Sequence, residues 1–351
     1  MTGYKNIKFN GIDRLYADYS WRLNSRAKSV WKSGDVLQGQ YLSKLEKAIA
    51  KKYKRKYAVG VGSATDGLYF AMQALGIKNT DTVVCPALSY IATAGAIKRL
   101  GANIQFVDTD AKGNIGEWGS IGLPSAVVYV NLYGNVADYT RLRAYCDRHK
   151  IPLIEDAAQS QGAMHGNIPS GKLGDVSVFS FDPMKNMPSF GSGGMVLTDD
   201  VRVFKNIMSI RRHGTLGGHE YGYNSLIPED HAHQLLLILD KFDRLQKMRT
   251  KVFKMYKKEL AGLELIECSD GNTPSHHKLV LLSKNRNGLQ EYLARAGIET
   301  KIHYKDVLDK SERYPNAEFI CARALSLPIY PHLKKEEVLY VCNKIKEFQN
   351  V

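Results

Sequence analysis

The stretch YAVGVGSATDG, residues 57–67, has the pattern of a β-strand that turns directly into a helix. The apolar run Tyr57–Val61 predicts the strand, the glycine and serine after it predict the turn, and residues 65–75 predict the helix. The first backbone N–H groups of such a helix lack intrahelical acceptors and carry partial positive charge, so they bind phosphate. Thr65 replaces the third glycine of the dinucleotide fingerprint, and no Walker-type lysine follows. The stretch therefore predicts a phosphate-binding turn of unspecified type.

The same alternation of short apolar runs and helical stretches continues to residue 200. Further apolar runs occupy residues 82–85, 104–107, 126–130, 152–154, 176–181 and 195–197. Strands that alternate with helices predict an α/β fold, with a mainly parallel sheet covered by helices on both faces. Ligands of such sheets bind outside the carboxyl ends of the strands, so we expect the functional site there.

The pattern changes after residue 225. Pro228, followed by two acidic residues, predicts the start of a long amphipathic helix. One strand and two helices are then predicted, at residues 278–282, 286–296 and 334–347. A chain of 351 residues is long enough for two domains. We therefore expect a larger domain over residues 1–244 and a smaller α+β domain over residues 245–351.

The composition indicates in which cellular compartment the protein works. No apolar run reaches the roughly 18 to 20 residues that a membrane span needs. The N-terminus is polar and lacks the apolar stretch of a secretory signal. The five cysteines are far apart in the sequence, which is typical of a reducing compartment. We expect a cytoplasmic protein that does not associate with a membrane.

The formal charge of +14 favours anionic ligands. The densest basic run, residues 51–56, lies near the end of a predicted helix, where cations face its partial negative charge. This run is either a solvated face or an attraction for an anionic substrate such as a nucleotide diphosphate. No zinc-finger or helix-turn-helix pattern is present, so we expect no nucleic-acid partner. His231 and His233 are two residues apart in a predicted helix and point to different faces, so we expect no metal site.

The segment Ile154-Glu155-Asp156-Ala157-Ala158-Gln159 places acidic side chains at the end of a predicted strand. Asp156 has two possible roles at such a position. It could cap the next turn, or it could pair with a protonated heterocyclic nitrogen. A carboxylate of the second kind keeps the ring of pyridoxal phosphate charged and makes it an electron sink.

A lysine follows the strand predicted to end near Phe181. Lys185 comes four residues later, and the glycine-rich segment of residues 191–194 comes after it. A surface lysine is the ordinary interpretation. At a strand end beside other cationic groups, however, a lysine loses its proton and forms Schiff bases. Ser180 is placed to offer a hydroxyl group to a phosphate, and Tyr90 is placed either to stack on a flat ring or to pack in the core.

Together these segments resemble the DegT/DnrJ/EryC1/StrS family of sugar aminotransferases. The resemblance extends from Gly39 to residue 330, almost the whole chain. It rests on the order and spacing of several short motifs: Glu155-Asp156-Ala157-Ala158-Gln159, Phe179-Ser180-Phe181 with Lys185-Asn186, Arg212-His213-Gly214, Gly222-Tyr223-Asn224, and Gly297-Ile298-Glu299-Thr300 with His303-Tyr304.

The resemblance implies the aspartate aminotransferase fold, also called fold type I, with pyridoxal phosphate as cofactor. It implies glutamate as amino donor and a nucleotide-diphosphate-linked keto-6-deoxysugar as acceptor, aminated at C3 or C4. Lys185 would form the Schiff base with the cofactor and carry protons during turnover. The remaining implied roles are ring-nitrogen pairing by Asp156, a ring-hydroxyl contact by Gln159, stacking by Tyr90, and phosphate binding by Ser63, Ala64 and Ser180.

The resemblance also implies a homodimer with shared active sites, because Asn224 would reach the phosphate bound by the neighbouring subunit. Two segments depart from the family pattern. Ser192 stands where many members have an acid, and Ser225-Leu226-Ile227-Pro228 replaces a basic residue followed by methionine. Both segments are expected near the substrate, so the nucleotide and the sugar stay open. The length of the segment between Lys185 and Gly194 slightly favours amination at C3.

Two alternatives to transamination are open to a chain with these motifs. Sugar dehydratases of the same family use the pyridoxamine form of the cofactor, but they carry histidine where this chain has Lys185. A non-catalytic scaffold with this fold is the other alternative. A scaffold would not require Asp156, Gln159, Ser180 and Lys185 together.

Overall fold

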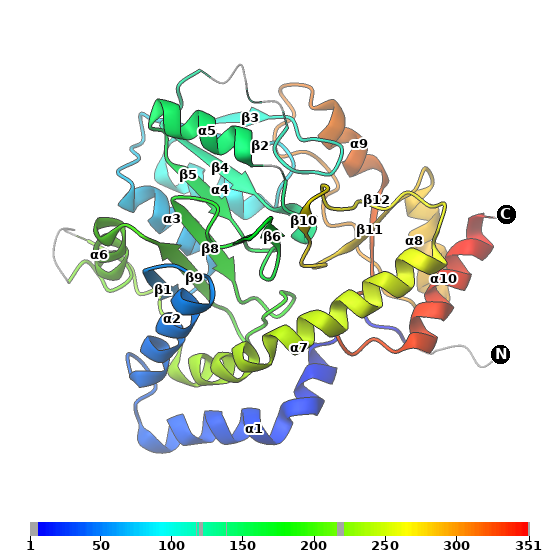
Figure 1. Ribbon diagram of the computed structural model, residues 1–351, viewed down its shortest axis with the longest axis horizontal. Coiled ribbons are helices and arrows are strands. Elements are labelled where there is room, and N and C mark those ends of the chain that lie inside the picture. The colour runs from blue at the N-terminus through cyan, green and yellow to red at the C-terminus, as the bar shows by residue number, and fades with distance from the viewer. Residues whose placement is uncertain (1–5, 117, 119–121, 138, 216–220, 350–351) are drawn as a thin grey trace.

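The computed structural model describes residues 6–116, 118, 122–137, 139–215 and 221–349, and its centre is a seven-stranded sheet (Figure 1). The strands lie in the order β1-β9-β8-β5-β4-β2-β3. Neighbours from β3 to β8 are parallel, whereas β9 runs antiparallel to both β8 and β1. The strands are β1 (Tyr57–Val61), β2 (Thr82–Pro86), β3 (Asn103–Val107), β4 (Ala126–Val130), β5 (Leu153–Asp156), β8 (Val176–Ser180) and β9 (Gly194–Thr198).

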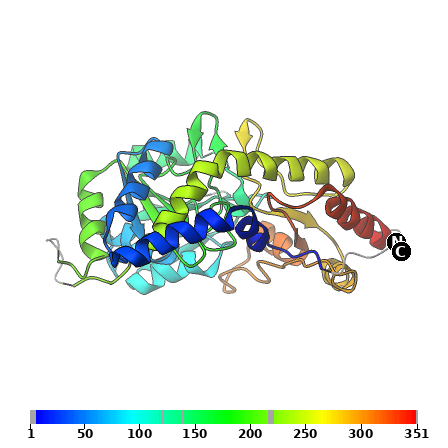
Figure 2. The ribbon, with the colours of Figure 1, turned by 90° about the horizontal axis from the view of Figure 1, so that it is seen from below.

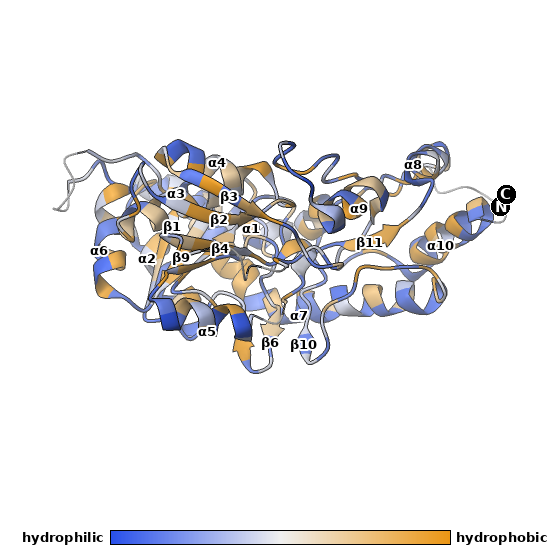
Figure 3. Ribbon diagram, turned by 90° about the horizontal axis from the view of Figure 1, so that it is seen from above, coloured by the Kyte–Doolittle hydropathy of each residue, from blue (hydrophilic) through white to orange (hydrophobic). Residues whose placement is uncertain are grey.

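Helices cover both faces of this sheet. One face packs against α3 (Ala64–Ala74), α4 (Ile91–Leu100) and α6 (Val201–Ile210). The opposite face packs against α2 (Gln40–Lys52), α5 (Thr140–His149) and α7 (Glu229–Glu259), and α1 (Ile12–Ser33) packs on α7. Figure 3 shows hydrophobic residues concentrated in the strands between the helices. Successive strand residues serve opposite faces, as Val83 and Val84 do, so both faces are apolar. The predicted α/β class is confirmed.

A smaller unit lies beside the sheet. It contains the antiparallel pair β11 (Leu279–Leu282) and β12 (Ala324–Leu327) with α8 (Arg286–Arg295), α9 (Pro315–Arg323) and α10 (Lys335–Gln349). Helix α7 runs without interruption from the larger unit to the smaller one (Figure 2). Leu245 belongs to a core cluster of the large unit, whereas Val252 belongs to that of the small unit. The division between residues 244 and 245 stays a prediction, and it falls inside this helix.

Most elements follow the sequence pattern. The strands predicted at residues 57–61 and 126–130 have the predicted bounds, and the long helix begins at Glu229 directly after Pro228. Helix α1 and strand β12 were not predicted. The small three-stranded sheet of β6 (Met164–His165), β7 (Ile168–Pro169) and β10 (Asn272–Thr273) was also missed, because two-residue strands carry no periodic signal.

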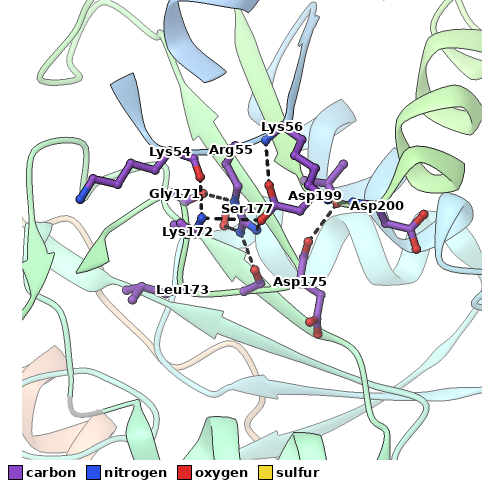
Figure 4. A network of polar contacts seen from close by, with 12 residues as sticks. Lys54, Arg55, Lys56, Gly171, Lys172, Leu173, Asp175, Ser177, Asp199 and Asp200 are labelled. Atoms are coloured by element: carbon purple, nitrogen blue, oxygen red, sulfur yellow. Dashed lines mark hydrogen bonds and ion pairs between the residues drawn. The ribbon is translucent and has the colours of Figure 1, made fainter. Parts of the chain in front are cut away.

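A buried arginine side chain links the ends of β1, β8 and β9 (Figure 4). These ends lie opposite the strand ends that carry the predicted site residues. Arg55 donates to the Gly171 carbonyl (2.8 Å) and the Ser177 hydroxyl (3.0 Å), and it pairs with Asp199 (3.1 Å). The Lys56 N–H donates to the same Asp199 carboxylate at 2.7 Å. One residue of the basic run is thus part of the core architecture and not of a solvated face. In the part of the chain that the structure describes, no helix is both long and apolar enough to cross a bilayer.

Candidate active site

The predicted phosphate-binding residues converge at the start of β9. Gly194 pairs with Ser180, the last residue of β8, and with Val61, the last residue of β1. A Cβ atom at Gly194 would lie 2.6 Å from the Ser63 carbonyl carbon and 2.7 Å from the Ala64 nitrogen. The N-terminus of α3 is therefore in direct contact with the start of β9, so only glycine fits at position 194. The strand pairing brings Ser63, Ala64 and Ser180 to one place.

The turn before α3 is held in shape by side chains. The Ser63 hydroxyl caps the helix by accepting from the Asp66 N–H at 3.1 Å. The Ser225 hydroxyl accepts from the Gly62 N–H at 2.8 Å and donates to the Asp66 carboxylate at 2.8 Å. The remaining N–H groups of the first helical turn have no intrahelical acceptor and suit an anion. Among the described residues the Ser180 hydroxyl accepts from the Asp182 N–H (3.3 Å) and donates to no acceptor, so its proton suits a bound anion.

Asp156 ends β5 and is 7% exposed. One carboxylate oxygen accepts from the Thr93 hydroxyl at 2.8 Å, and the other accepts from the Ala158 N–H at 3.2 Å. The second contact is the turn cap that the sequence allowed as an alternative, and the same carboxylate also faces the site. Burial raises the pKa of Asp156 above its ordinary value, although the Thr93 hydrogen bond and the positive charge of Lys185 oppose the shift.

The neighbouring acid, Glu155, points to the opposite face of the sheet. Its carboxylate is fully buried and accepts hydrogen bonds from side chains and main-chain amides. The donors are Asn131 (2.8 Å), Ser170 (2.7 Å), Ser177 (2.6 Å), and the N–H groups of Gly171 (3.0 and 3.1 Å) and Leu173 (3.1 Å). Glu155 is therefore an anchor for the loop before β8, and only Asp156 faces the site.

Lys185 lies in the loop after β8, in a turn closed by its N–H and the Asp182 carbonyl at 2.9 Å. Burial lowers the pKa of Lys185 below its ordinary value, although the charges of Asp156 and Asp182 oppose this. The next residue fixes the loop, because the Asn186 amide donates to the Ser275 carbonyl (2.9 Å) and contacts the His277 ring (3.1 Å). Lys185 therefore loses its proton more easily than an exposed lysine does.

Gln159 and Tyr90 occupy different environments. The Gln159 oxygen accepts from the Tyr133 N–H at 3.0 Å, and its amide nitrogen donates to the Tyr304 hydroxyl at 2.9 Å. Its contact with a cofactor ring stays a prediction. Tyr90 precedes α4 and is 61% exposed, so core packing does not account for it. Its ring is free to stack on a ligand, which also stays a prediction.

Asn224 is exposed and is bridged through its backbone to Arg212. Its side chain makes no hydrogen bond to the other predicted site residues within the described part of the chain. The next residue, Ser225, touches the Gly62 turn. Asn224 is thus close in sequence to the phosphate turn of its own chain, and its reach to a neighbouring subunit stays a prediction.

Several residues that shape the site were not predicted. Thr93 orients Asp156, and Tyr304 orients Gln159. The His303-Tyr304 motif gave a signal for the second of these residues. Lys278 and Arg249 are buried and line the same cleft as Lys185. The local sequence does not distinguish them from the exposed lysines and arginines that are common in helices and at strand ends.

The donor set fits pyridoxal phosphate. The ring nitrogen requires a carboxylate, the aldehyde requires an amine, and the phosphate requires unpaired N–H and hydroxyl donors. The charges of Asp156 and Lys185 influence each other, but the two side chains form no ion pair within the described residues, so a direct contact does not block either group from a ligand. The described residues contain no group of three or more His, Cys, Asp or Glu side chains that could hold a metal ion.

A lysine and a carboxylate facing a phosphate-binding turn, on a sheet of this topology, define an enzyme of the pyridoxal phosphate class. The sequence matches the profile of the DegT/DnrJ/EryC1/StrS aminotransferase family over residues 20–346. The chain belongs to this family.

Individual relatives align along almost their whole length. A protein of Geobacillus stearothermophilus described as a pleiotropic regulatory protein is 34% identical, with 98% of each chain covered. The dTDP-3-amino-3,4,6-trideoxy-alpha-D-glucose transaminase of Streptomyces venezuelae is 30% identical, with 97% of this chain and 96% of the relative covered. The crystal structure of S. venezuelae DesV in complex with a ketimine intermediate matches with a TM-score of 0.95 at 30% identity, covering 99% of this chain and all of the other. The predicted family, fold type and cofactor, pyridoxal phosphate, are confirmed.

Proposed function

We propose that this enzyme transfers the amino group of glutamate to the ketone of a nucleotide-diphosphate-linked keto-6-deoxysugar, at C3 or C4. The observation that carries the proposal is that Asp156 and Lys185 lie near enough to influence each other's pKa without forming an ion pair, in a member of this family. The S. venezuelae relative is named for amination at C3 of a dTDP-linked sugar, which supports the C3 position. The five cysteines are all free, which supports the cytoplasm as the compartment.

Each side chain has a defined task in this reaction. When bound, pyridoxal phosphate supplies an aldehyde that condenses with amines and a ring that accepts an electron pair. Asp156 holds a proton at the ring nitrogen, and Ser180 and the first amides of α3 hold the phosphate. The Lys185 amine takes a proton from the α-carbon of the donor and later delivers a proton to the sugar carbon. Burial favours the neutral amine that the first of these steps requires.

The function is tested by following the visible absorbance of the cofactor joined to Lys185. Purified protein is loaded with pyridoxal phosphate, then treated with glutamate, then with a panel of nucleotide-linked 3-keto and 4-keto sugars. We expect glutamate to remove the band and one sugar to restore it, with an aminated product by mass spectrometry. A deoxygenated product without nitrogen would instead show the dehydratase. A protein that gains no band with added cofactor would favour the scaffold.

Substitution separates the role of the lysine from folding. Lys185→Ala is expected to abolish the band and turnover while leaving the melting temperature of the cofactor-free protein near that of the cofactor-free wild type. Lys251→Ala is the matched control, because Lys251 is exposed on α7 and forms no ion pair among the described residues. Retained turnover in Lys185→Ala would rule out the assigned proton carrier.

We also propose that Asn224 completes the phosphate site of a partner subunit in a homodimer. Its side chain is exposed and unbonded to its own site, and exposed aromatic residues flank it at Tyr221 and Tyr223. Inactive Lys185→Ala and Asn224→Ala proteins are mixed under conditions that exchange subunits. If sites are shared, one site of each mixed dimer has both residues intact, and roughly a quarter of all sites recover. No recovery, or a monomer by analytical ultracentrifugation, would overturn the shared site.

A further inference from the structure

A cleft between the large and small units has cationic walls and no acidic ones. It is partly open to solvent and is bounded by the N-terminal segment, the Lys185 loop, α7 and the residue directly before β11. Lys185, Lys278 and Arg249 line it, and its described lining residues include no aspartate or glutamate. The Asn10 amide donates to the Pro183 carbonyl at 3.1 Å, which fixes the N-terminal wall to the lysine loop.

Lys278 is 8% exposed, yet no carboxylate pairs with it among the described residues. Its ammonium lies 4.8 Å from the centre of the Phe9 ring, and the Lys301 ammonium lies 5.4 Å from the same ring. Buried lysines are ordinarily paired, because an isolated buried charge is costly. Burial, followed by the nearby charges of Lys185, Arg249 and Lys301, lowers the pKa of Lys278 well below its ordinary value, and the charge of Asp182 opposes the shift.

Arg249, on helix α7, is a second buried cation of this cleft. It is 6% exposed and donates to the Ile329 carbonyl at 2.8 Å, but it pairs with no carboxylate within the described ranges. A guanidinium stays protonated at neutral pH and offers donors that match a carboxylate. Two buried cations beside the reacting amine, both without a counter-ion, therefore point to an anionic ligand.

We infer that Lys278 and Arg249 form a carboxylate-binding subsite that receives the amino-acid donor beside Lys185. The inference rests on the proposed function, which requires an amino-acid donor. The α-carboxylate of such a donor is bonded to the carbon that loses its proton, so it must lie near the reacting amine. A second anion-binding element, the turn before α3, lies apart from this cleft and serves the cofactor phosphate. The donor carboxylate is therefore the ligand that leaves both cations compensated.

Binding of glutarate, a dicarboxylate that cannot transfer an amino group, tests the subsite. Calorimetric titration of the cofactor-loaded protein compares the wild type with Lys278→Met, Arg249→Met and the control Lys251→Met. Loss of a charge-assisted hydrogen bond is expected to weaken glutarate by about tenfold or more in the first two variants. Lys278→Arg, which keeps a positive charge, is expected to restore part of the affinity. Unchanged glutarate affinity in Lys278→Met would overturn the inference.

The nucleotide-sugar diphosphate is the competing source of negative charge, and UDP distinguishes it. Weaker UDP binding in Lys278→Met with intact glutarate binding would assign the cations to the nucleotide and overturn the donor subsite. Arg249→Met removes a buried hydrogen bond and could unfold, so Lys278→Met carries the test alone if the melting temperature of the Arg249 variant falls. If glutarate binding depends on Lys278 but glutamate never removes the cofactor band, the proposed function fails and the subsite stands.

Discussion

Replacing Asp156 by asparagine is expected to change cofactor affinity and cofactor-free stability in opposite directions. The side chain is buried, and its carboxylate accepts from the Thr93 hydroxyl and the Ala158 N–H. The introduced amide keeps both contacts, because the Thr93 hydroxyl also bonds the Ser89 hydroxyl at 2.8 Å and either atom can donate. Thr93 therefore reverses its hydroxyl, accepts from the new amide, and donates to Ser89. The variant removes a charge without removing packing or hydrogen bonds.

The magnitudes follow from the buried charge. A hydrogen bond to a charged partner contributes about 1.5–3 kcal/mol, so the affinity for pyridoxal phosphate should fall by about 10- to 100-fold. In the cofactor-free protein the pKa of Asp156 is raised by burial. A carboxyl group with a raised folded pKa destabilises the fold above that pKa and not below its unfolded value, because the ionised form is the disfavoured one. The variant should therefore be more stable at neutral pH, by about 1.4 kcal/mol for each pH unit by which the folded pKa of Asp156 exceeds its unfolded pKa.

Urea unfolding of the cofactor-free proteins from about pH 4 to about pH 8 measures the second effect, and a fluorescence titration with pyridoxal phosphate measures the first. The stability difference should be small at the acid end and grow as pH rises through the folded pKa of Asp156. Asp35→Asn is the control, because Asp35 is exposed. A variant that loses stability equally at every pH, or that binds the cofactor as the wild type does, would refute the reasoning.

Three further results are expected. Glu155→Gln should lower the free energy of unfolding by about 2–3 kcal/mol in urea, because the new amide group faces donors; an unchanged midpoint would contradict the anchor role. Gly194→Ala should cost about 1–3 kcal/mol and weaken phosphate binding, whereas Gly95→Ala, with open space around its Cβ, should not destabilise α4. The rate at which Lys185 captures cofactor should level off below pH 10.5, because burial lowers its pKa; a rate that still climbs at that pH would show an ordinary lysine.

The parts of the site that the sequence predicts are those that lie next to a recognisable strand or turn. Asp156 and Lys185 each follow an apolar strand, and parallel strands bring their carboxyl ends to one edge, so their proximity followed from the fold class. The turn before α3 was visible for the same reason. Neighbouring residues of a strand point to opposite faces, so the sequence predicts that Glu155 and Asp156 lie on different faces of the sheet. It does not show which of the two faces carries the site.

The unpredicted parts depend on contacts between distant segments. Thr93 meets Asp156 across 63 positions of sequence, and Gln159 meets Tyr304 across 145. Helix α1 is stabilised by packing on α7, about 200 residues later in the sequence. The sequence around α1 therefore does not show which element it packs against. Lys278 was placed at the start of a strand, but its burial depends on Phe9 and on the loop of Lys185.

The charges of this site predict that its ligands stabilise the folded protein. Asp156 bears a carboxylate whose ionised form is disfavoured by burial, and Lys185 and Lys278 bear ammonium groups disfavoured in the same way. A direct ion pair between Asp156 and Lys185 would relieve both, but it would fill the space where the cofactor ring must lie. In the roles we propose, each ligand would compensate a charge that lacks an ion-pair partner among the described residues: the ring nitrogen would compensate Asp156, and the donor carboxylate would compensate Lys278. Because ligands that bind only the folded state raise its stability, the melting temperature should rise first with pyridoxal phosphate and again with glutarate. The second increment should be absent in Lys278→Met, and its persistence there would show that the dicarboxylate is held elsewhere.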